Sequence, residues 1–163
     1  HIVITVIIGV SGCVSVCSFA LSRARVSEYP FCMRTVTSDS RPGLRAHAES
    51  IQLPFDELVS RMRDILGVRL VAYIGGVKAA RQVTLWADGA GKPGEDDQQR
   101  LRHAFQAAAL LRERYDPITI QSWFKGMNPM LNDEAPAMVL RDGDPITAPR
   151  EVIAAAKAFA YIG

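Results

Sequence analysis

Trp123-Phe124-Lys125-Gly126-Met127-Asn128-Pro129-Met130-Leu131 decides the fold, together with Ala135-Pro136-Ala137 and Leu140-Arg141-Asp142-Gly143 soon after it. A helix that carries the aromatic pair is expected to end at Gly126, and the Asn-Pro pair is typical of a turn. A new helix is expected to begin near Asp133 and to end at Gly143. The layout offers no nucleophile beside a base and no set of metal ligands. It therefore indicates a rigid docking platform, and the functional question becomes which partner it binds.

Helices are predicted on both sides of this platform. Before it, a long helix is expected from Glu95 to Arg114, with acidic residues in its first turn and arginines in its last, as the helix dipole favours. Asp116 and Pro117 are a typical cap and first residue of the next helix. After the platform, Thr147 is expected to cap a last helix with an inner apolar stripe of Val152, Ile153, Ala156 and Phe159.

The part of the chain before Glu95 has the outline of a helix-turn-helix. Apolar residues recur at helical spacing from Phe55 to Leu66, and Gly67 ends that helix. A short helix over 69–75, a Gly75-Gly76 turn and a third helix over 78–87 should follow. In the third helix Ala79, Ala80, Val83 and Trp86 are expected to face inward.

The outer face of this third helix is a candidate DNA-binding surface, made of Lys78, Arg81, Gln82 and Thr84. Charge favours this part of the chain, because residues 54–94 carry six basic and four acidic groups, whereas residues 95–163 carry eight basic and ten acidic groups. The spacing from Gly76 to Trp86 is one residue longer than in common repressors. The alternative is a solvated helix face that binds no DNA.

These patterns predict an all-α protein with three segments: a leader and linker over 1–53, a helix-turn-helix unit over 54–94 and a C-terminal helical bundle over 95–163. No enzyme, metal site or cofactor is predicted, because His47 and His103 are isolated. All three cysteines (Cys13, Cys17, Cys32) lie in the leader, which suits a reducing, cytoplasmic setting for the rest of the chain.

The leader allows two interpretations. Residues 2–21 contain no charged side chain and are long enough to span a bilayer, with Arg23 and Arg25 directly after them. The favoured interpretation is that residues 1–50 are a disordered or wrongly assigned start that lies outside the working fold. The less favoured interpretation is a membrane anchor.

The chain ends in Phe159-Ala160-Tyr161-Ile162-Gly163, an apolar terminus without a polar tail. Chain ends are usually polar and frayed. This end is therefore expected either to pack against its own bundle or to insert into another protein, and the second is favoured.

Residues 95–163 resemble the toxin-binding domain of the Xre/MbcA/ParS-type antitoxins. The residues that carry the resemblance are Trp123, Gly126, Asn128, Pro129, Leu131, Pro136, Leu140, Arg141 and Gly143, followed by Val152-Ile153 and Ala154-Ala155-Ala156. The preceding helix-turn-helix, with Trp86-Ala87 and Gly89, has the same place in that family. Two features depart from the family pattern. The extra residue before the third helix affects the expectation of operator binding, and the segment 144–149 affects how far the C-terminal tail reaches.

The resemblance implies an antitoxin that neutralises a RES-domain, NAD⁺-degrading toxin by covering its active-site entrance. The implied toxin-binding residues are Arg150, Ile153, Lys157, Phe159, Tyr161, Ile162 and Gly163. It also implies a homodimer or a toxin–antitoxin hetero-oligomer that can repress its own operon. The alternative function is a stand-alone helix-turn-helix regulator whose C-terminal part only dimerises.

Overall fold

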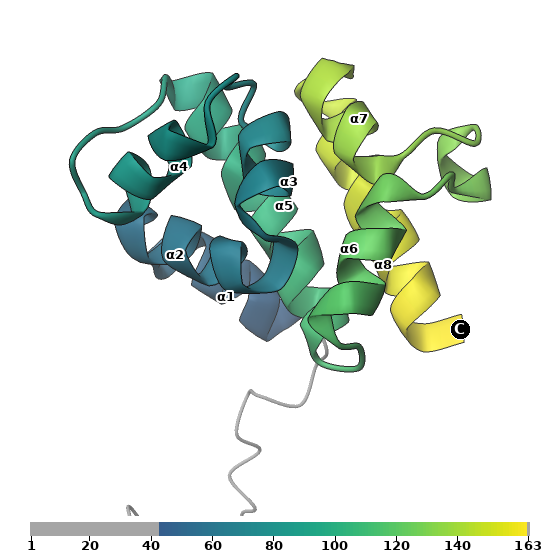
Figure 1. Ribbon diagram of the computed structural model, residues 1–163. Coiled ribbons are helices and arrows are strands. Elements are labelled where there is room, and N and C mark those ends of the chain that lie inside the picture. The colour runs from purple at the N-terminus through teal and green to yellow at the C-terminus, as the bar shows by residue number, and fades with distance from the viewer. Residues whose placement is uncertain (1–42, 163) are drawn as a thin grey trace, which may run out of the picture. The chain divides into compact units, whose positions relative to one another are not determined.

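Residues 43–162 are described by a computed structural model and contain eight α-helices and one short 3-10 helix (Figure 1). No strand occurs among these residues, so the all-α prediction is confirmed. Residues 1–42 lie outside the described residues, and with them the predicted anchor and all three cysteines. The helices are α1 (Leu44–Gln52), α2 (Phe55–Leu66), α3 (Val68–Ile74), α4 (Ala80–Ala87), α5 (Glu95–Arg112), α6 (Pro117–Lys125), η2 (Pro129–Leu131), α7 (Pro136–Asp142) and α8 (Thr147–Ile162).

Helix α1 corrects the predicted linker, which was expected to run to residue 53. Its sequence carries a weak apolar pattern, but Ala46 and Ser50 are buried against the rest of the fold. Arg102 of α5 donates hydrogen bonds to the carbonyl oxygens of Ser50 at 2.6 Å and Leu53 at 3.2 Å. This side chain partners carbonyls at the C-terminal end of α1 that the helix itself leaves open. A contact between distant parts of the sequence therefore helps to define this helix.

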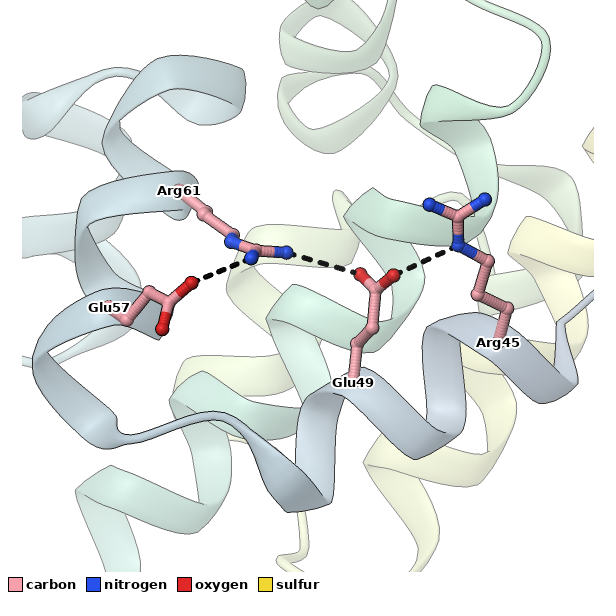
Figure 2. A network of polar contacts seen from close by, with 4 residues as sticks. All are labelled: Arg45, Glu49, Glu57 and Arg61. Carbon is pink, nitrogen blue, oxygen red and sulfur yellow. Dashed lines mark hydrogen bonds and ion pairs between the residues drawn. The ribbon is translucent and has the colours of Figure 1, made fainter. Parts of the chain in front are cut away.

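A chain of charged side chains also joins α1 to α2 (Figure 2). The carboxylate of Glu49 accepts from Arg45 at 3.0 Å and pairs with Arg61 at 3.7 Å, and Arg61 donates to Glu57 at 2.6 Å. These side chains are largely exposed, so each pair contributes little stability. The network orients the two helices more than it holds them together.

The long helix α5 is the centre of the packing. It contacts α1, α2 and α3 and also α6, α7 and α8, and its residues Leu101, Ala104, Phe105, Ala108 and Leu111 are buried. The described residues 43–162 all belong to one compact unit. The helix that begins at residue 95 thus supplies core to the segments predicted on both sides of it.

The glycine turns lie where the sequence placed them. Gly67 ends α2, and Gly76 has φ of +68°, a left-handed conformation that glycine adopts without a steric penalty. Val83 and Trp86 of α4 are buried, as predicted. The prediction that Ala79 and Ala80 face inward is wrong, because both are exposed where α4 begins, two residues later than expected.

The platform of the C-terminal part is built largely as predicted. Asp116 accepts a hydrogen bond from the backbone N–H of Thr119 at 2.9 Å, so it caps α6. The helix expected near Asp133 begins instead at Pro136, because Asn132 and Asp133 have φ of 55° and 60°, which no right-handed helix accommodates. These left-handed residues close the turn ahead of α7.

The cap of α8 also differs from the prediction. Asp144 accepts from the backbone N–H groups of Ile146 and Thr147 and from the Thr147 hydroxyl, so Asp144, and not Thr147, provides the capping carboxylate. These hydrogen bonds lower the pKa of Asp144 below its usual range. Gly143 allows the close turn before α8, because a Cβ there would lie 2.5 Å from the Val139 carbonyl oxygen.

Candidate docking surfaces

The C-terminal end of α8 is anchored to the fold by Phe159. Its ring centroid lies 4.8 Å from that of Tyr115 and 6.2 Å from that of Trp123. The Tyr115 hydroxyl donates to the backbone carbonyl of Phe159 at 3.0 Å. Phe159 is therefore half-buried in its own scaffold, which agrees with its place in the predicted inner stripe of this helix. Its predicted role in the tip that enters a partner stays a prediction.

Tyr161 is the aromatic residue that this end of the helix presents to solvent. Its side chain is 41% exposed, and the guanidinium of Arg114 lies 5.2 Å from its ring centroid. The side chain of Ile162 and all of Gly163 lie outside the described residues. The predicted tip thus consists, as far as the structure describes it, of one aromatic ring on a firmly placed helix end.

The remaining predicted toxin-binding residues lie farther back along α8. Lys157 is exposed, while Arg150 and Ile153 line a hollow of about 360 Å³ together with His47 and His103. Burial lowers the pKa of His103, and the nearby His47 lowers it further. Eleven residues separate Arg150 from Tyr161, which is about 16 Å along a helix. The predicted set therefore forms an extended strip and not one patch.

A loop beside α8 presents two methionines that the sequence analysis did not select. Met127 is 81% exposed and Met130 is 59% exposed. Asn128 holds the loop, because its side-chain oxygen accepts from Met130 N–H at 3.0 Å and its backbone bonds to Asp133 and Glu134. The 3-10 helix of this loop packs against α8. Methionine is a common residue of adaptable binding surfaces. The two methionines flank the Asn128-Pro129 pair of the predicted turn, and this position could have indicated that both are exposed.

The motif residues of the resemblance divide into core and turn. Trp123, Leu131, Pro136 and Leu140 are buried, whereas Gly126, Pro129 and Gly143 are exposed in the turns. Trp123 is only 9% exposed, so its ring belongs to the core. Its indole N–H, like that of Trp86, is buried without a hydrogen-bond partner in the structure.

The predicted DNA-binding residues lie around the start of α4. Lys78 and Arg81 are exposed, while Gln82 and Thr84 are partly buried. Lys78 also borders a hollow of about 300 Å³ with Arg69, Tyr73 and Arg141. The Arg141 guanidinium lies 4.6 Å from the Tyr73 ring centroid. The sequence analysis missed Arg69 and Arg141 as neighbours of Lys78, because α7 reaches α3 only through the tertiary fold.

Two searches of residues 43–162 bear on other classes of site. No group of three or more His, Cys, Asp or Glu side chains in that range is placed to hold a metal ion. No helix in the same range combines the length and the apolar character needed to cross a bilayer.

Comparison of the chain with protein-family models, with curated proteins and with solved structures found no match.

Proposed function

We propose that this chain is the antitoxin of a type II toxin–antitoxin module and that it neutralises a RES-domain, NAD⁺-degrading toxin in the cytoplasm. The proposal starts from the resemblance of residues 95–163 to the Xre/MbcA/ParS-type antitoxins. The observation that carries it is the end of α8, where Tyr161 is exposed on a helix that Phe159 fixes to the bundle. A blocker of an enzyme entrance needs an apolar tip in a fixed position and no reactive group.

The fixed position matters for affinity. Binding orders side chains and loops, and that ordering opposes association. Because the Tyr115 hydroxyl and the Trp123 ring already hold Phe159, the end of α8 has little backbone freedom left to lose. Tyr161 is then the aromatic anchor, and Met127 and Met130 extend the apolar surface beside the helix. Arg150 and Lys157 act as charges at the rim, which affect the rate of association more than the affinity.

The test is co-expression with the toxin encoded next to this gene, with bacterial growth as the readout. Removing residues 161–163 should abolish protection while the helical bundle stays folded. A deletion from residue 159 is a poorer test, because it also removes a ring that packs in the scaffold. Protection by the chain that ends at residue 160 would count against the proposal.

Tyr73 supplies a matched control for Tyr161. Each tyrosine is partly exposed, 37% and 41%, and each has an arginine guanidinium over its ring. Tyr161→Ala should reduce neutralisation, and Tyr73→Ala should leave it intact. An equal loss in both variants would point to a general effect of losing a surface tyrosine and not to a docking role of α8.

DNA binding is the second candidate function, either as autorepression by the antitoxin or as the activity of a stand-alone regulator that dimerises through its C-terminal part. The observation in its favour is the exposed basic start of α4, with Lys78 and Arg81, after the left-handed turn at Gly76. A gel shift with the promoter upstream of the gene tests it. Arg81→Ala should weaken DNA binding by roughly 1–3 kcal/mol if Arg81 contacts a base. A second experiment distinguishes an antitoxin from a stand-alone regulator: the chain is purified together with the product of the neighbouring gene, and the mass of the complex is measured.

A further inference from the structure

Three cations from separate parts of the chain meet around Tyr73. Arg69 comes from the start of α3, Lys78 from the turn before α4 and Arg141 from the end of α7. They line the hollow of about 300 Å³ with Tyr73, Gly76 and small apolar residues, and its lining includes no carboxylate. Such a hollow has a positive potential that favours an anion.

The charge of this hollow is largely uncompensated within the described residues. No ion pair links Arg69 or Lys78 to another residue of that range. Arg141 has one exposed partner, Asp142, at 3.5 Å. The Arg141 guanidinium lies over the Tyr73 ring, 4.6 Å from its centroid, and the nitrogen that it shares with Asp142 is Nε. Its two terminal amino groups can still donate to an acceptor. Three cations that line one hollow, with one exposed acidic partner among them, indicate a site for a ligand that supplies negative charge.

The neighbouring surface indicates which anion fits. Lys78 also borders a second hollow, which Gln82, Lys92 and Asp97 line among others. Asp97 is already paired with Arg100 at 2.8 Å, so basic groups continue from α3 past the start of α4. A row of cations beside the exposed end of a helix matches the way proteins contact a nucleic-acid backbone, where phosphate contacts position the helix and base contacts specify the sequence. A single small phosphate would use only the first hollow.

We propose that Arg69, Lys78 and Arg141 hold a backbone phosphate of duplex DNA while α4 meets the groove. The inference rests on the second candidate function, DNA binding, and adds to it a contact from α7. Since α7 packs against α8, one element then contacts both the DNA-binding surface and the helix proposed for toxin binding. Arg69 and Arg141 position the protein on DNA, and they read no base.

The experiment measures the affinity of the full-length chain for two labelled duplexes, its own upstream promoter and a scrambled sequence, by fluorescence anisotropy across a range of salt concentrations. In the double variant Arg69→Gln/Arg141→Gln, the slope of log K against log salt should fall by about two, one for each lost phosphate contact. Affinity at 0.1 M salt should fall roughly tenfold for each cation. Both duplexes should lose affinity by the same factor, because phosphates carry no sequence.

The matched control is Arg112→Gln/Arg114→Gln, which removes the same charge at the C-terminal end of α5. The hollow lies near the other end of this helix, where Arg100 Nη1 lies 3.5 Å from the Ile74 carbonyl oxygen beside the Gly76 turn. This control should change the slope by much less than one unit. Circular dichroism and thermal unfolding establish that each variant is folded. The single variant Arg69→Gln serves if Arg141→Gln proves unstable, because Arg69 forms no ion pair within residues 43–162 whose loss would disturb the fold.

The outcomes separate this inference from the function on which it rests. If the wild-type chain binds DNA and the double variant keeps its slope, the hollow is not a phosphate site, while DNA binding through α4 stands. An equal loss in the Arg112/Arg114 control also overturns the inference, since net charge alone would explain it. If the wild-type chain binds neither duplex, both proposals fail. Binding of inorganic phosphate without any duplex binding would assign the hollow to a small anion and overturn the DNA contact.

Discussion

Two regions of this molecule carry the same local arrangement, an arginine guanidinium over a partly exposed tyrosine. At the end of α8, Arg114 lies over Tyr161, and Phe159, two residues earlier, packs against Tyr115 and Trp123. At α3, Arg141 lies over Tyr73, and the surroundings are Arg69 and Lys78. One pair belongs to an apolar, anchored surface, and the other borders an accumulation of positive charge. The same contact can therefore serve two different partners, because the surrounding residues decide what binds.

Salt should separate the two regions most strongly. About four cations (Arg69, Lys78, Arg81 and Arg141) are available for phosphate contacts, so DNA affinity should fall roughly a hundredfold between 50 and 200 mM salt. Toxin affinity through the apolar end of α8 should change less than about threefold, because burial of apolar surface depends little on screening. Titrations of both partners at the two salt concentrations check this. Equal sensitivity to salt would erase the distinction between the regions.

Phe159→Ala should break the anchored region. The ring is half-buried, so its removal should lower the free energy of unfolding by about 2 kcal/mol, less than for a fully buried phenylalanine. Tyr161→Ala, on the same helix, should change it by less than about 0.5 kcal/mol. Urea denaturation measures both variants. If the two substitutions cost the same, Phe159 does not hold the end of α8.

Gly76→Ala should disturb the charged region in the same kind of experiment. The left-handed backbone at φ of +68° disfavours any residue with a Cβ, so the expected loss is about 1–2 kcal/mol. Gly91 offers a control, because it has no positive φ and a Cβ there would lie 4.0 Å from the nearest atom, a Trp86 ring carbon. Gly91→Ala should be neutral or slightly stabilising. A neutral Gly76→Ala would mean that the turn before α4 adopts another conformation.

The smallest expected effect concerns His103, which lies between the two regions on α5. Burial lowers its pKa from the usual 6.5, so the folded state prefers the neutral ring. As the pH falls below 6.5, the unfolded chain takes up a proton before the folded one does, and stability is lost until the pH reaches the folded-state pKa. Thermal unfolding at pH 7.5 and 5.5 should show a flatter profile for His103→Gln than for the wild type. Identical profiles would indicate that His103 is freely solvated.

The helices whose ends are set by local chemistry could be predicted from the sequence. Asp116 and Pro117 start α6, Gly67 ends α2, and Gly76 makes a turn that other residues adopt at a cost. These features act within a few residues of the chain. The starts of α4 at Ala80 and of α7 at Pro136 were predicted wrongly. In both places several neighbouring residues could begin a helix, and the conformation of the preceding turn determines which one does.

The candidate sites were predictable only in part. Lys78, Arg81 and Tyr161 are exposed. The first two were recognisable from helical spacing, and Tyr161 from the apolar end of the chain. The inward orientation of Phe159 was predicted from the apolar stripe, but its packing against Trp123 and Tyr115 was not, because these rings are 36 and 44 residues away in the sequence. The helix α1 was missed for the same reason, since the Arg102 side chain that bonds its last carbonyls belongs to α5.

The amino-acid sequence by itself thus determined the order of the helices, most of their ends and the presence of an apolar terminus, since capping, left-handed turns and apolar spacing are short-range effects. Only the tertiary structure decided that Arg141 lies beside Tyr73 and Arg69, and that the Phe159 ring packs against Tyr115 and Trp123. Those outcomes depend on which helices pack together. Helix packing depends on the shape and the buried area of whole surfaces, and residues far apart in the sequence form those surfaces.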